Sequence, residues 1–540
     1  MVANFKNRSV NVHDFAMTPH ADIPRSSFSI PHTHKTTFDA GYLVPVYVDE
    51  VLPGDTFNVK MTAFARLSTP LFPTMDNLHM ESFFFFVPNR LVWTNWKRFN
   101  GEQTNPGDSV SYVIPQLVSP VGGYAVNTIF DYMGLPTVGQ VGGANTVSHS
   151  ALPLRAYNLI WNEWFRDENL VPSLPVQVDD GPDVLGNYGT QLRGKRHDYF
   201  TSCLPWPQKG TSVSLPLGTS APVKIVPFGT STNPWISQNA ATGALGNGAL
   251  SAAAGTGQVN IAGTTQAFDP NGRLFADLSV ATAATINQLR QSFQIQKLLE
   301  RDARGGTRYT EIILSHFGVR SPDARLQRPE FLGGGSTPVN VSPIVQQSAT
   351  GVTGGSTPMG TLGGVGSFVA NNHGFRQSFT EHGHVIGIVC VRADLTYQQG
   401  MRRMWSRSTR YDYYWPAFAM LGEQAVLNKE IYCDGSANDA LVFGYQERWG
   451  EYRYNPSMIT GLFRSTSAGT IDGWHYAQKF ASLPTLNRTF IEESAQSTVS
   501  RSIAVGAAAN GKQFIFDSFF DVRAARPLPM YSVPGLIDHF

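Results

Sequence analysis

Apolar and polar residues alternate along much of the first hundred positions of the chain. Within 56–66 every second residue from Phe57 to Ala65 is apolar, and the residues between them are polar except for Phe64. A period of two places successive side chains on opposite faces of a strand, so the pattern predicts a strand with one buried face. The preceding LPGD at 52–55 supplies a proline and a glycine for a turn.

Further strands are predicted by later apolar runs. At 78–87 the four phenylalanines 83–86 place aromatic rings on both faces, which suits a sheet packed between another sheet and a neighbour. Similar runs predict strands at 384–397, 440–454 and 512–523. Short strands separated by long connections favour an all-β sandwich or jelly roll over alternating βαβ units.

A helical period marks the segment 155–172. Its large apolar residues recur at the spacing of one helix face, with Pro153 near the start and Pro172 at the end. Such a stripe must dock on a large apolar surface, in a packed core or at an interface. The stripe consists of Tyr157, Ile160, Trp161, Trp164 and Phe165.

Two more helices are predicted at about 284–304 and 307–317, on either side of Gly305 and Gly306. A glycine pair ends the first helix and allows a bend before the second. The second helix again carries an apolar stripe. This stripe consists of Tyr309, Ile312, Ile313, His316 and Phe317.

The composition indicates a protein that buries much of its surface against partners. Charged residues make up 15% of the 540 residues, aromatic residues make up 12%, and a direct count finds 30 Arg against 11 Lys. Few charges, many aromatics and an excess of Arg are typical of protein–protein interface cores. A large monomer with a large core is the alternative, although such a monomer needs a charged surface to stay soluble.

Net charge and targeting signals narrow the possible classes of protein. A net charge of +1 argues against a coat that condenses nucleic acid by charge alone, although a local basic face is compatible with it. Three widely spaced cysteines without a CxxC pair indicate a reducing compartment rather than a disulfide framework or zinc site. We expect no signal peptide, because the first 15 residues contain no apolar core, and no membrane span.

Two long stretches, 229–267 and 331–375, contain no Asp, Glu, Lys or Arg. The first has the composition of a linker, but large apolar residues are interspersed in it. Composition alone leaves open whether it is a free linker or an insertion that packs against copies of itself. For the second stretch we predict irregular strand and loop that threads between subunits.

Signals for catalysis or metal binding are weak. The chain contains no GxSxG, HExxH, P-loop or dinucleotide-binding motif. His32 with His34, and His382 with His384, have the same-face spacing of strand residues, but neither pair has a convincing third ligand. We therefore predict ordinary histidines and no metal site or cofactor. Three acidic residues near the LPGD turn have the chemistry of calcium ligands, although a solvated turn is the better interpretation: Asp49, Glu50 and Asp55.

One basic constellation lies at 401–415, MRRMWSRSTRYDYYW. Arginine forks bind phosphates and aromatic rings stack on unpaired bases, so the mixture is typical of single-stranded nucleic-acid binding. An interface between subunits uses the same residue types and is slightly favoured. A second small basic site, Lys6 and Arg8, lies in the predicted N-terminal arm 1–34. The candidate nucleic-acid contacts in the first constellation are Arg402, Arg403, Trp405, Arg407 and Arg410.

Several long strings in this sequence resemble the major capsid protein of the Microviridae, small phages with single-stranded DNA, and specifically their gokushovirus branch. Long strings in matching order are more specific than a short motif. Together they cover roughly a third of the chain, whereas about 210–285 matches poorly. The strings lie at 46–77, 81–93, 155–172, 286–319, 321–334 and 411–432.

The resemblance implies a single jelly-roll domain over 1–540, with eight strands and with long insertions that contain a few helices. It implies a small icosahedral shell with one copy per asymmetric unit, about 60 copies in all. In the resembled viruses an insertion corresponding to 210–285 projects at the three-fold axes. The implied partners are a circular single-stranded DNA genome, a host receptor, and small DNA-binding, pilot and scaffolding proteins.

Two hypotheses of different class follow. The first is a structural capsid subunit that assembles in the host bacterial cytoplasm and contributes to host attachment. The second is a small β-sandwich protein that binds carbohydrate through exposed aromatic rings or cleaves it with paired carboxylates. Particle size separates them, since shells indicate a capsid and a species near the 59.1 kDa of one chain indicates the second.

Overall fold

The computed structural model describes residues 24–213, 286–347, 360–492, 498–504 and 511–531, together with the backbone of short strands between 223 and 276. It divides into two compact units. One comprises Met1–Pro207 with Gly305–Phe540, and the other comprises Gln208–Arg304. Most of the predicted N-terminal arm, residues 1–23, lies outside the described residues, whereas its end forms strands β1 and β2.

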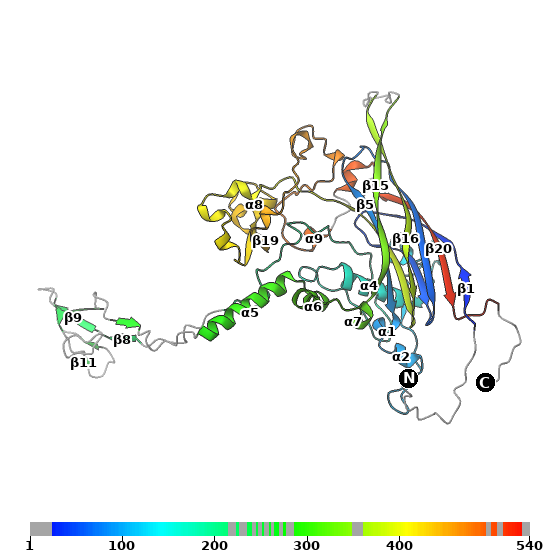
Figure 1. Ribbon diagram of the computed structural model, residues 1–540, viewed down its shortest axis with the longest axis horizontal. Coiled ribbons are helices and arrows are strands. Elements are labelled where there is room, and N and C mark those ends of the chain that lie inside the picture. Colours follow the sequence, from blue (N-terminus) through cyan, green and yellow to red (C-terminus); the bar gives the residue numbers. More distant parts are fainter. Residues whose placement is uncertain are drawn as a thin grey trace, which may run out of the picture. The chain divides into compact units, whose positions relative to one another are not determined.

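The larger unit contains one large antiparallel sheet that curls over, so that its two halves face each other as a sandwich and stay joined by the pairing of β15 with β16 (Figure 1). Strands β1 and β2 pair with successive parts of β20, so they form one interrupted strand and the sandwich has eight. The predicted eight-stranded jelly roll is therefore confirmed. The first half has the order β1 (Ser26–Ser29) with β2 (His32–Phe38), β20 (Phe514–Arg526), β4 (Thr56–Leu67) and β16 (Leu362–Ser378). The second has the order β3 (Val44–Val51), β17 (Gly383–Ala393), β5 (Leu78–Pro88) and β15 (Glu330–Val345).

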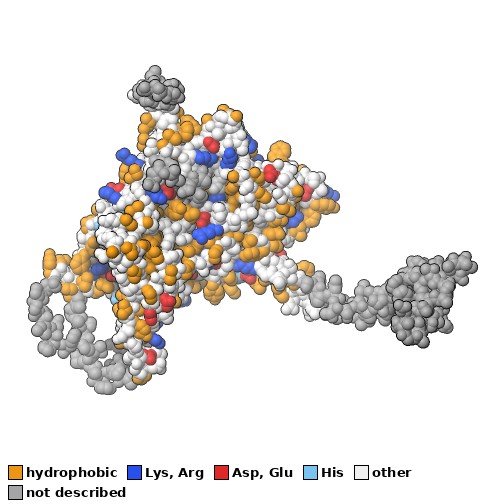
Figure 2. Space-filling view, turned by 180° about the vertical axis from the view of Figure 1, so that it is seen from behind, with side chains coloured by type: hydrophobic (Ala, Val, Ile, Leu, Met, Phe, Trp, Pro, Cys, Tyr) orange, Lys and Arg blue, Asp and Glu red, His pale blue; other side chains and the backbone are white. Residues whose placement is uncertain are grey.

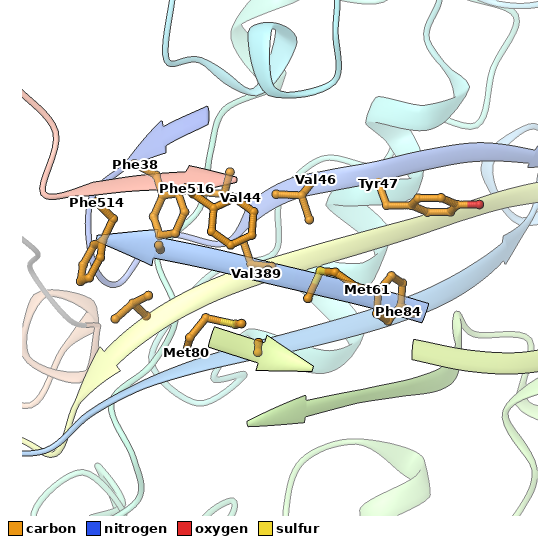
Figure 3. Packing of buried hydrophobic residues seen from close by; sticks show 14 of the residues in the cluster. Phe38, Val44, Val46, Tyr47, Met61, Met80, Phe84, Val389, Phe514 and Phe516 are labelled. Carbon is orange, nitrogen blue, oxygen red and sulfur yellow. The ribbon is translucent and has the colours of Figure 1, made fainter. Parts of the chain in front are cut away.

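The core between the two halves is built from the alternating apolar residues of their inner faces. Strand β4 buries every second side chain from Phe57 to Leu67, as its pattern predicted. Aromatic rings join the two halves: Tyr47 of β3 lies 5.2 Å from Phe520 of β20, centroid to centroid. Figure 3 shows Phe514 and Phe516 of β20 beside Phe38 of β2, and Met61 of β4 beside Phe84 of β5.

A second core covers the opposite face of β5 and β17. Helix α4 (Leu152–Ile160) and the π-helical turn Trp161–Phe165 pack there. This explains the phenylalanine run of β5, because Phe84 and Phe86 belong to the first core and Phe85 to the second. The helix predicted over 155–172 thus begins earlier and ends at Phe165. Its end is fixed by extended backbone at Arg166 and by the Asp167 carboxylate, which accepts hydrogen bonds from the next turn.

The strand predictions at 56–66, 78–87 and 512–523 are confirmed by β4, β5 and β20. The prediction at 384–397 is confirmed for β17, which ends at Ala393. The strand predicted at 440–454 is wrong beyond Glu447, because β19 (Val442–Glu447) is followed by a 3-10 turn at Gly450–Tyr452.

Strand and loop were predicted at 331–375, and the strand part is confirmed, because the described residues form β15 and β16, with one irregularity each in their pairings with β5 and β4. Glycines allow these strands to pack closely rather than break them. A Cβ on Gly334 would collide with the carbonyl oxygen of Ser82, and one on Gly335 would lie 2.6 Å from the His373 ring. His373 bridges the Ser82 and Thr337 hydroxyls at 2.9 and 3.0 Å, so this close approach holds β5, β15 and β16 together.

Long connections carry the remaining elements of the larger unit. Between β5 and β15 lie α1 (Asn89–Val92), α2 (Trp96–Phe99), β6 (Gln116–Val118), α3 (Ile129–Tyr132), β7 (Ser148–Ser150), α4, the turns Trp161–Phe165 and Leu185–Asn187, α6 (Tyr309–Phe317) and α7 (Asp323–Leu326). Between β17 and β20 lie 3-10 turns, β18 (Glu423–Leu427), α8 (Asn428–Ile431), β19 and α9 (Arg488–Ile491). Within the described ranges, no helix has the length and apolar character needed to cross a bilayer.

The smaller unit contains helix α5 (Ile286–Arg304), which confirms the prediction at 284–304. It also contains short strands, of which β9 (Trp235–Asn239) pairs with β10 (Leu245–Gly246) and β13 (Thr264–Phe268). The others are β8 (Val223–Ile225) with β14 (Leu274–Ala276), and β11 (Ser251–Ala252) with β12 (Val259–Asn260). Side chains of the charge-free stretch 229–267 lie outside the described residues.

Candidate nucleic-acid interface

The basic constellation predicted at 401–415 is held by a carboxylate in its centre. Asp412 accepts hydrogen bonds from the backbone N–H groups of Ser408 and Thr409, at 2.9 and 2.7 Å, and from the Thr409 hydroxyl at 2.9 Å. These donors, Thr409 first, stabilise the charged carboxylate and lower the pKa of Asp412 to about 2. The loop is thereby fixed at neutral pH, together with the arginines that flank it.

Two of the predicted arginines are neutralised within the subunit. Arg403 Nη1 donates to Glu430 Oε1 at 3.0 Å, and Arg407 Nη2 donates to Glu451 Oε1 at 3.2 Å. Both carboxylates are buried at the side chain. Burial raises the pKa of Glu430 above its ordinary value, and the charge of Arg403 opposes that shift. Arg403 and Arg407 therefore serve chiefly to balance buried charge.

The other two arginines remain open to a ligand. In the part of the chain that the structure describes, no carboxylate forms an ion pair with Arg402 or Arg410. The Arg410 guanidinium lies 4.8 Å above the ring of Trp415. Trp405, which lies between Arg402 and Arg410 in the sequence, is 70% exposed. The sequence predicted four equivalent arginines. Among the residues that the structure describes, Arg403 and Arg407 form ion pairs with carboxylates, whereas Arg402 and Arg410 do not.

A cavity of about 630 Å³ opens beside Arg402, whereas Arg410, Trp405 and Trp415 do not line it. Its aromatic lining includes Tyr199, Tyr413, Tyr452 and Tyr454, and the first and last of these stack at 5.2 Å. Its charged lining consists of Arg402, Arg403, Arg407, Arg453, Glu430 and Glu451. Three of these arginines are paired with Glu430, Glu451 and, outside the lining, Glu447, so among the described residues Arg402 supplies the unpaired positive charge. One free guanidinium beside several aromatic rings suits a flat ring with an anionic group. An unpaired nucleotide has this chemistry, and so has a surface of another subunit with aromatic and acidic side chains.

The predicted helix stripe lies mainly within the core of the subunit itself. Tyr157, Ile160 and Trp161 are at most 1% exposed, and Trp164 and Phe165 are partly buried beside them. The Tyr157 hydroxyl donates to the Leu43 carbonyl at 2.7 Å, and the Trp164 indole donates to the Pro329 carbonyl at 3.0 Å. These five residues therefore pack inside the subunit. The predicted basic residues Lys6 and Arg8 lie outside the described residues.

The histidines and carboxylates considered as metal ligands have other partners. His32 stacks on Phe520, and His34 Nδ1 lies 2.8 Å from the Val46 carbonyl oxygen. Burial lowers the pKa of His384 to about 4, and its Nδ1 lies 2.8 Å from the Asn89 side-chain oxygen. Asp55 accepts a hydrogen bond from the Leu52 N–H and so closes the LPGD turn. No cluster of three His, Cys, Asp or Glu suited to a metal ion occurs among residues with described positions.

The apolar faces of α5 and α6 are exposed to solvent in the subunit. The sequence predicted both helices but not the exposure of these faces. No residue of α6 is buried, and Tyr309 and Phe317 are 71% and 77% exposed. In the smaller unit, Phe293 and Leu298 of α5 are 65% and 50% exposed. Figure 2 shows apolar side chains spread over one face of the molecule with scattered charges between them. Helix faces of this kind are stable when another surface covers them.

The whole chain is similar to known capsid proteins. A family profile described as "Capsid protein (F protein)" matches residues 16–536. Capsid protein VP1 of Bdellovibrio phage phiMH2K is 48% identical over 98% of this chain and 99% of that protein. Capsid protein VP1 of Chlamydia phage 1 is 42% identical over 99% and 100%. Capsid protein VP1 of Spiroplasma virus 4 is 38% identical over 98% of each chain.

Proposed function

Because the chain belongs to the family of phage capsid F proteins, we propose that it assembles with copies of itself into a small icosahedral shell around a circular single-stranded DNA genome. The resemblance to gokushovirus capsid proteins of the Microviridae is confirmed. The chain is a structural protein of the virion and not an enzyme.

The carbohydrate hypothesis is not retained, since the similarity to capsid proteins covers nearly the whole chain. We propose assembly in the host bacterial cytoplasm, with scaffolding, pilot and small DNA-binding proteins as partners.

Helix α6 is the observation that carries the proposal of self-assembly. It bears the apolar stripe predicted from the sequence, yet none of its residues is buried by the described chain. Tyr309 and Phe317 at its two ends are exposed, and Ile312 and Ile313 are only partly buried. Exposed apolar residues of this kind on a charge-poor protein favour association. Copies of the same chain in a closed symmetric shell supply a covering surface for every subunit.

We propose that the insertion 210–285 projects at the three-fold axes and contributes to host attachment. Its stretch 229–267 has no charge to keep it soluble by repulsion, so contact with its own copies around an axis would stabilise it. Loops presented by a rigid scaffold commonly carry recognition. The sequence resemblance supports this position.

The experiment compares the native chain with a variant in which a short Gly-Ser linker replaces 229–267. We expect both to form shells that package DNA, seen by negative-stain imaging, and expect only the native shells to adsorb to the host. A native chain that stays near 59.1 kDa when it is produced together with the other phage proteins would contradict self-assembly. Undiminished adsorption of the variant would contradict the attachment role alone.

We propose that Arg402, Arg410 and Trp405 contact unpaired nucleotides of the genome, and that Lys6 and Arg8 do so if the N-terminal arm lies inside the shell. Support comes from the two open arginines, the exposed indole and the cavity lined by Arg402. Arginine binds phosphate and an aromatic ring stacks on a base without sequence preference. Arg403 and Arg407 hold the loop in place through their ion pairs, so their charge is not available to the nucleic acid.

Replacing Arg402 and Arg410 by Gln is expected to leave shell formation intact and to weaken DNA retention. Loss of two phosphate contacts should lower the salt dependence of retention by about 1.4 in the slope of log affinity against log salt. The matched control is Arg403→Gln with Arg407→Gln, which should instead destabilise the subunit because Glu430 and Glu451 lose their partners. If the first pair abolishes shells while its subunits stay folded, the cluster is a subunit interface.

A further inference from the structure

Strands β15 and β16 continue beyond the sandwich as a two-stranded arm. Strand β15 pairs with β5 as far as Val339, and from Asn340 to Val345 it pairs with β16 instead. Strand β16 pairs with β4 only from Ser367 onward. Residues 340–346 and 360–366, here called the distal arm, therefore form a ribbon outside both halves of the sandwich, and Figure 1 shows it extending past the other strands.

One face of the distal arm is covered by its own subunit at Gly364 and Gly366, whereas Val345 on the same face is 51% exposed. A Cβ on Gly364 would lie 3.0 Å from the Phe72 carbonyl oxygen, and one on Gly366 would lie 2.7 Å from the Leu67 side chain. Both glycines thus point toward the segment 67–72. Because side chains alternate along a strand, residues 363 and 365 point to the opposite side of the ribbon.

The opposite face exposes two apolar side chains among uncharged polar residues. By the pairing register, Ser342 and Ile344 of β15 lie opposite Val365 and Gly363 of β16 on this face. Ile344 is 51% exposed and Val365 is 44% exposed. No charged residue occurs anywhere in 331–375. Natural sheets protect exposed ribbons with charges, so a ribbon without them is expected to have a partner.

The partner does not add as a strand to the edge of β15. Pro343 lies in the middle of the free segment and has no N–H to donate. The side-chain face formed by Ser342, Ile344 and Val365 is the better contact. A nucleic-acid partner would require cations that the arm lacks. An uncharged apolar surface instead matches a charge-poor protein surface.

We propose that this face of the distal arm docks on a neighbouring copy of the chain and fastens adjacent subunits in the shell. The inference rests on the proposed self-assembly. A shell places a copy of the chain beside every arm in a fixed orientation. The arm is anchored by the Ser82, Thr337 and His373 contacts at its base, so its position is set before docking.

Photo-cross-linking tests the partner directly. The variant Ile344→Cys is made with Cys433→Ser, since Cys433 is exposed while Cys203 and Cys390 are buried. The new thiol is labelled with a benzophenone maleimide, and intact shells are irradiated. We expect a product of about twice the 59.1 kDa chain mass in shells and none in dissociated subunits. Shells whose cross-links reach only DNA, another phage protein or the same chain would overturn the inference.

A charge substitution provides the second measurement. Ile344→Lys with Val365→Lys is expected to leave subunits folded by circular dichroism but to reduce shell yield about tenfold or more. The matched control is Val113→Lys, since Val113 is 75% exposed and lies outside the arm. Equal yields from the arm variant and the native chain would overturn the inference. Failure of the native chain to form any shell in the presence of the other phage proteins would instead overturn the proposed self-assembly.

Discussion

Replacing Trp161 by alanine is expected to lower the free energy of unfolding of the subunit by about 3–5 kcal/mol. The indole is 1% exposed and lies in the core between α4 and the sheet of β5 and β17. Its Nε1 donates to the Leu192 carbonyl at 3.2 Å, and the Arg488 guanidinium lies 5.6 Å above the ring. Truncation leaves a large cavity and removes a buried hydrogen bond. Denaturant titration followed by circular dichroism measures the change.

Trp405→Ala is the matched control, because the same substitution removes an indole that is 70% exposed. Its effect on the stability of the isolated subunit is expected to stay within about 0.5 kcal/mol. Equal losses for the two variants would contradict the assignment of Trp161 to the subunit core. Normal stability and normal shell yield for Trp161→Ala would contradict it as well.

The strands of the jelly roll were predictable where one face is buried and the other is solvated. Residues 56–66 follow that rule, and β4 shows the same alternation of buried and exposed positions. Strand β15 was not predictable in this way, because its neighbours approach too closely for side chains at Gly334 and Gly335. Local composition shows glycine and a lack of charge, and only tertiary structure distinguishes close packing from a loop.

The end of the helix predicted at 155–172 could not be located from the sequence either. The apolar spacing located the stripe correctly, and α4 with its π-helical turn presents it to the core. The early end depends on Asp167, whose carboxylate holds the next turn by accepting hydrogen bonds from Asn169 and Leu170. Such side-chain capping competes with helix continuation and has only a weak signal in the sequence.

The candidate site was located by sequence, but its electrostatics were not. Arg402 to Arg410 are close neighbours in the chain, so their clustering is visible. The carboxylates that neutralise half of them, Glu430 and Glu451, lie 27 and 44 positions away from Arg403 and Arg407 respectively. Long-range pairing of this kind follows from the fold. The sequence therefore overstated the free charge that a nucleic acid would meet.

A buried ion pair beneath α4 carries the second large expected effect. Arg155 is fully buried, and its Nε donates to Asp183 Oδ2 at 2.8 Å while Nη2 lies 2.5 Å from Oδ1. Asp183→Ala is expected to lower the free energy of unfolding by about 3–5 kcal/mol, because the guanidinium loses its buried counter-charge. The Tyr188 hydroxyl, which donates to the same carboxylate, loses its acceptor too. Thermal and denaturant unfolding measure the loss.

Asp179→Ala separates charge burial from simple ion pairing, since Asp179 contacts the same guanidinium at 3.2 Å with a carboxylate that is 68% exposed. Water replaces an exposed carboxylate easily, so this variant should cost at most about 1 kcal/mol. Similar losses for the two variants would show that the Asp183 pair contributes no more than a surface salt bridge. A large loss confined to Asp183→Ala would mean that α4 is held against the segment 179–183 by buried charge, in addition to the contacts of its apolar stripe.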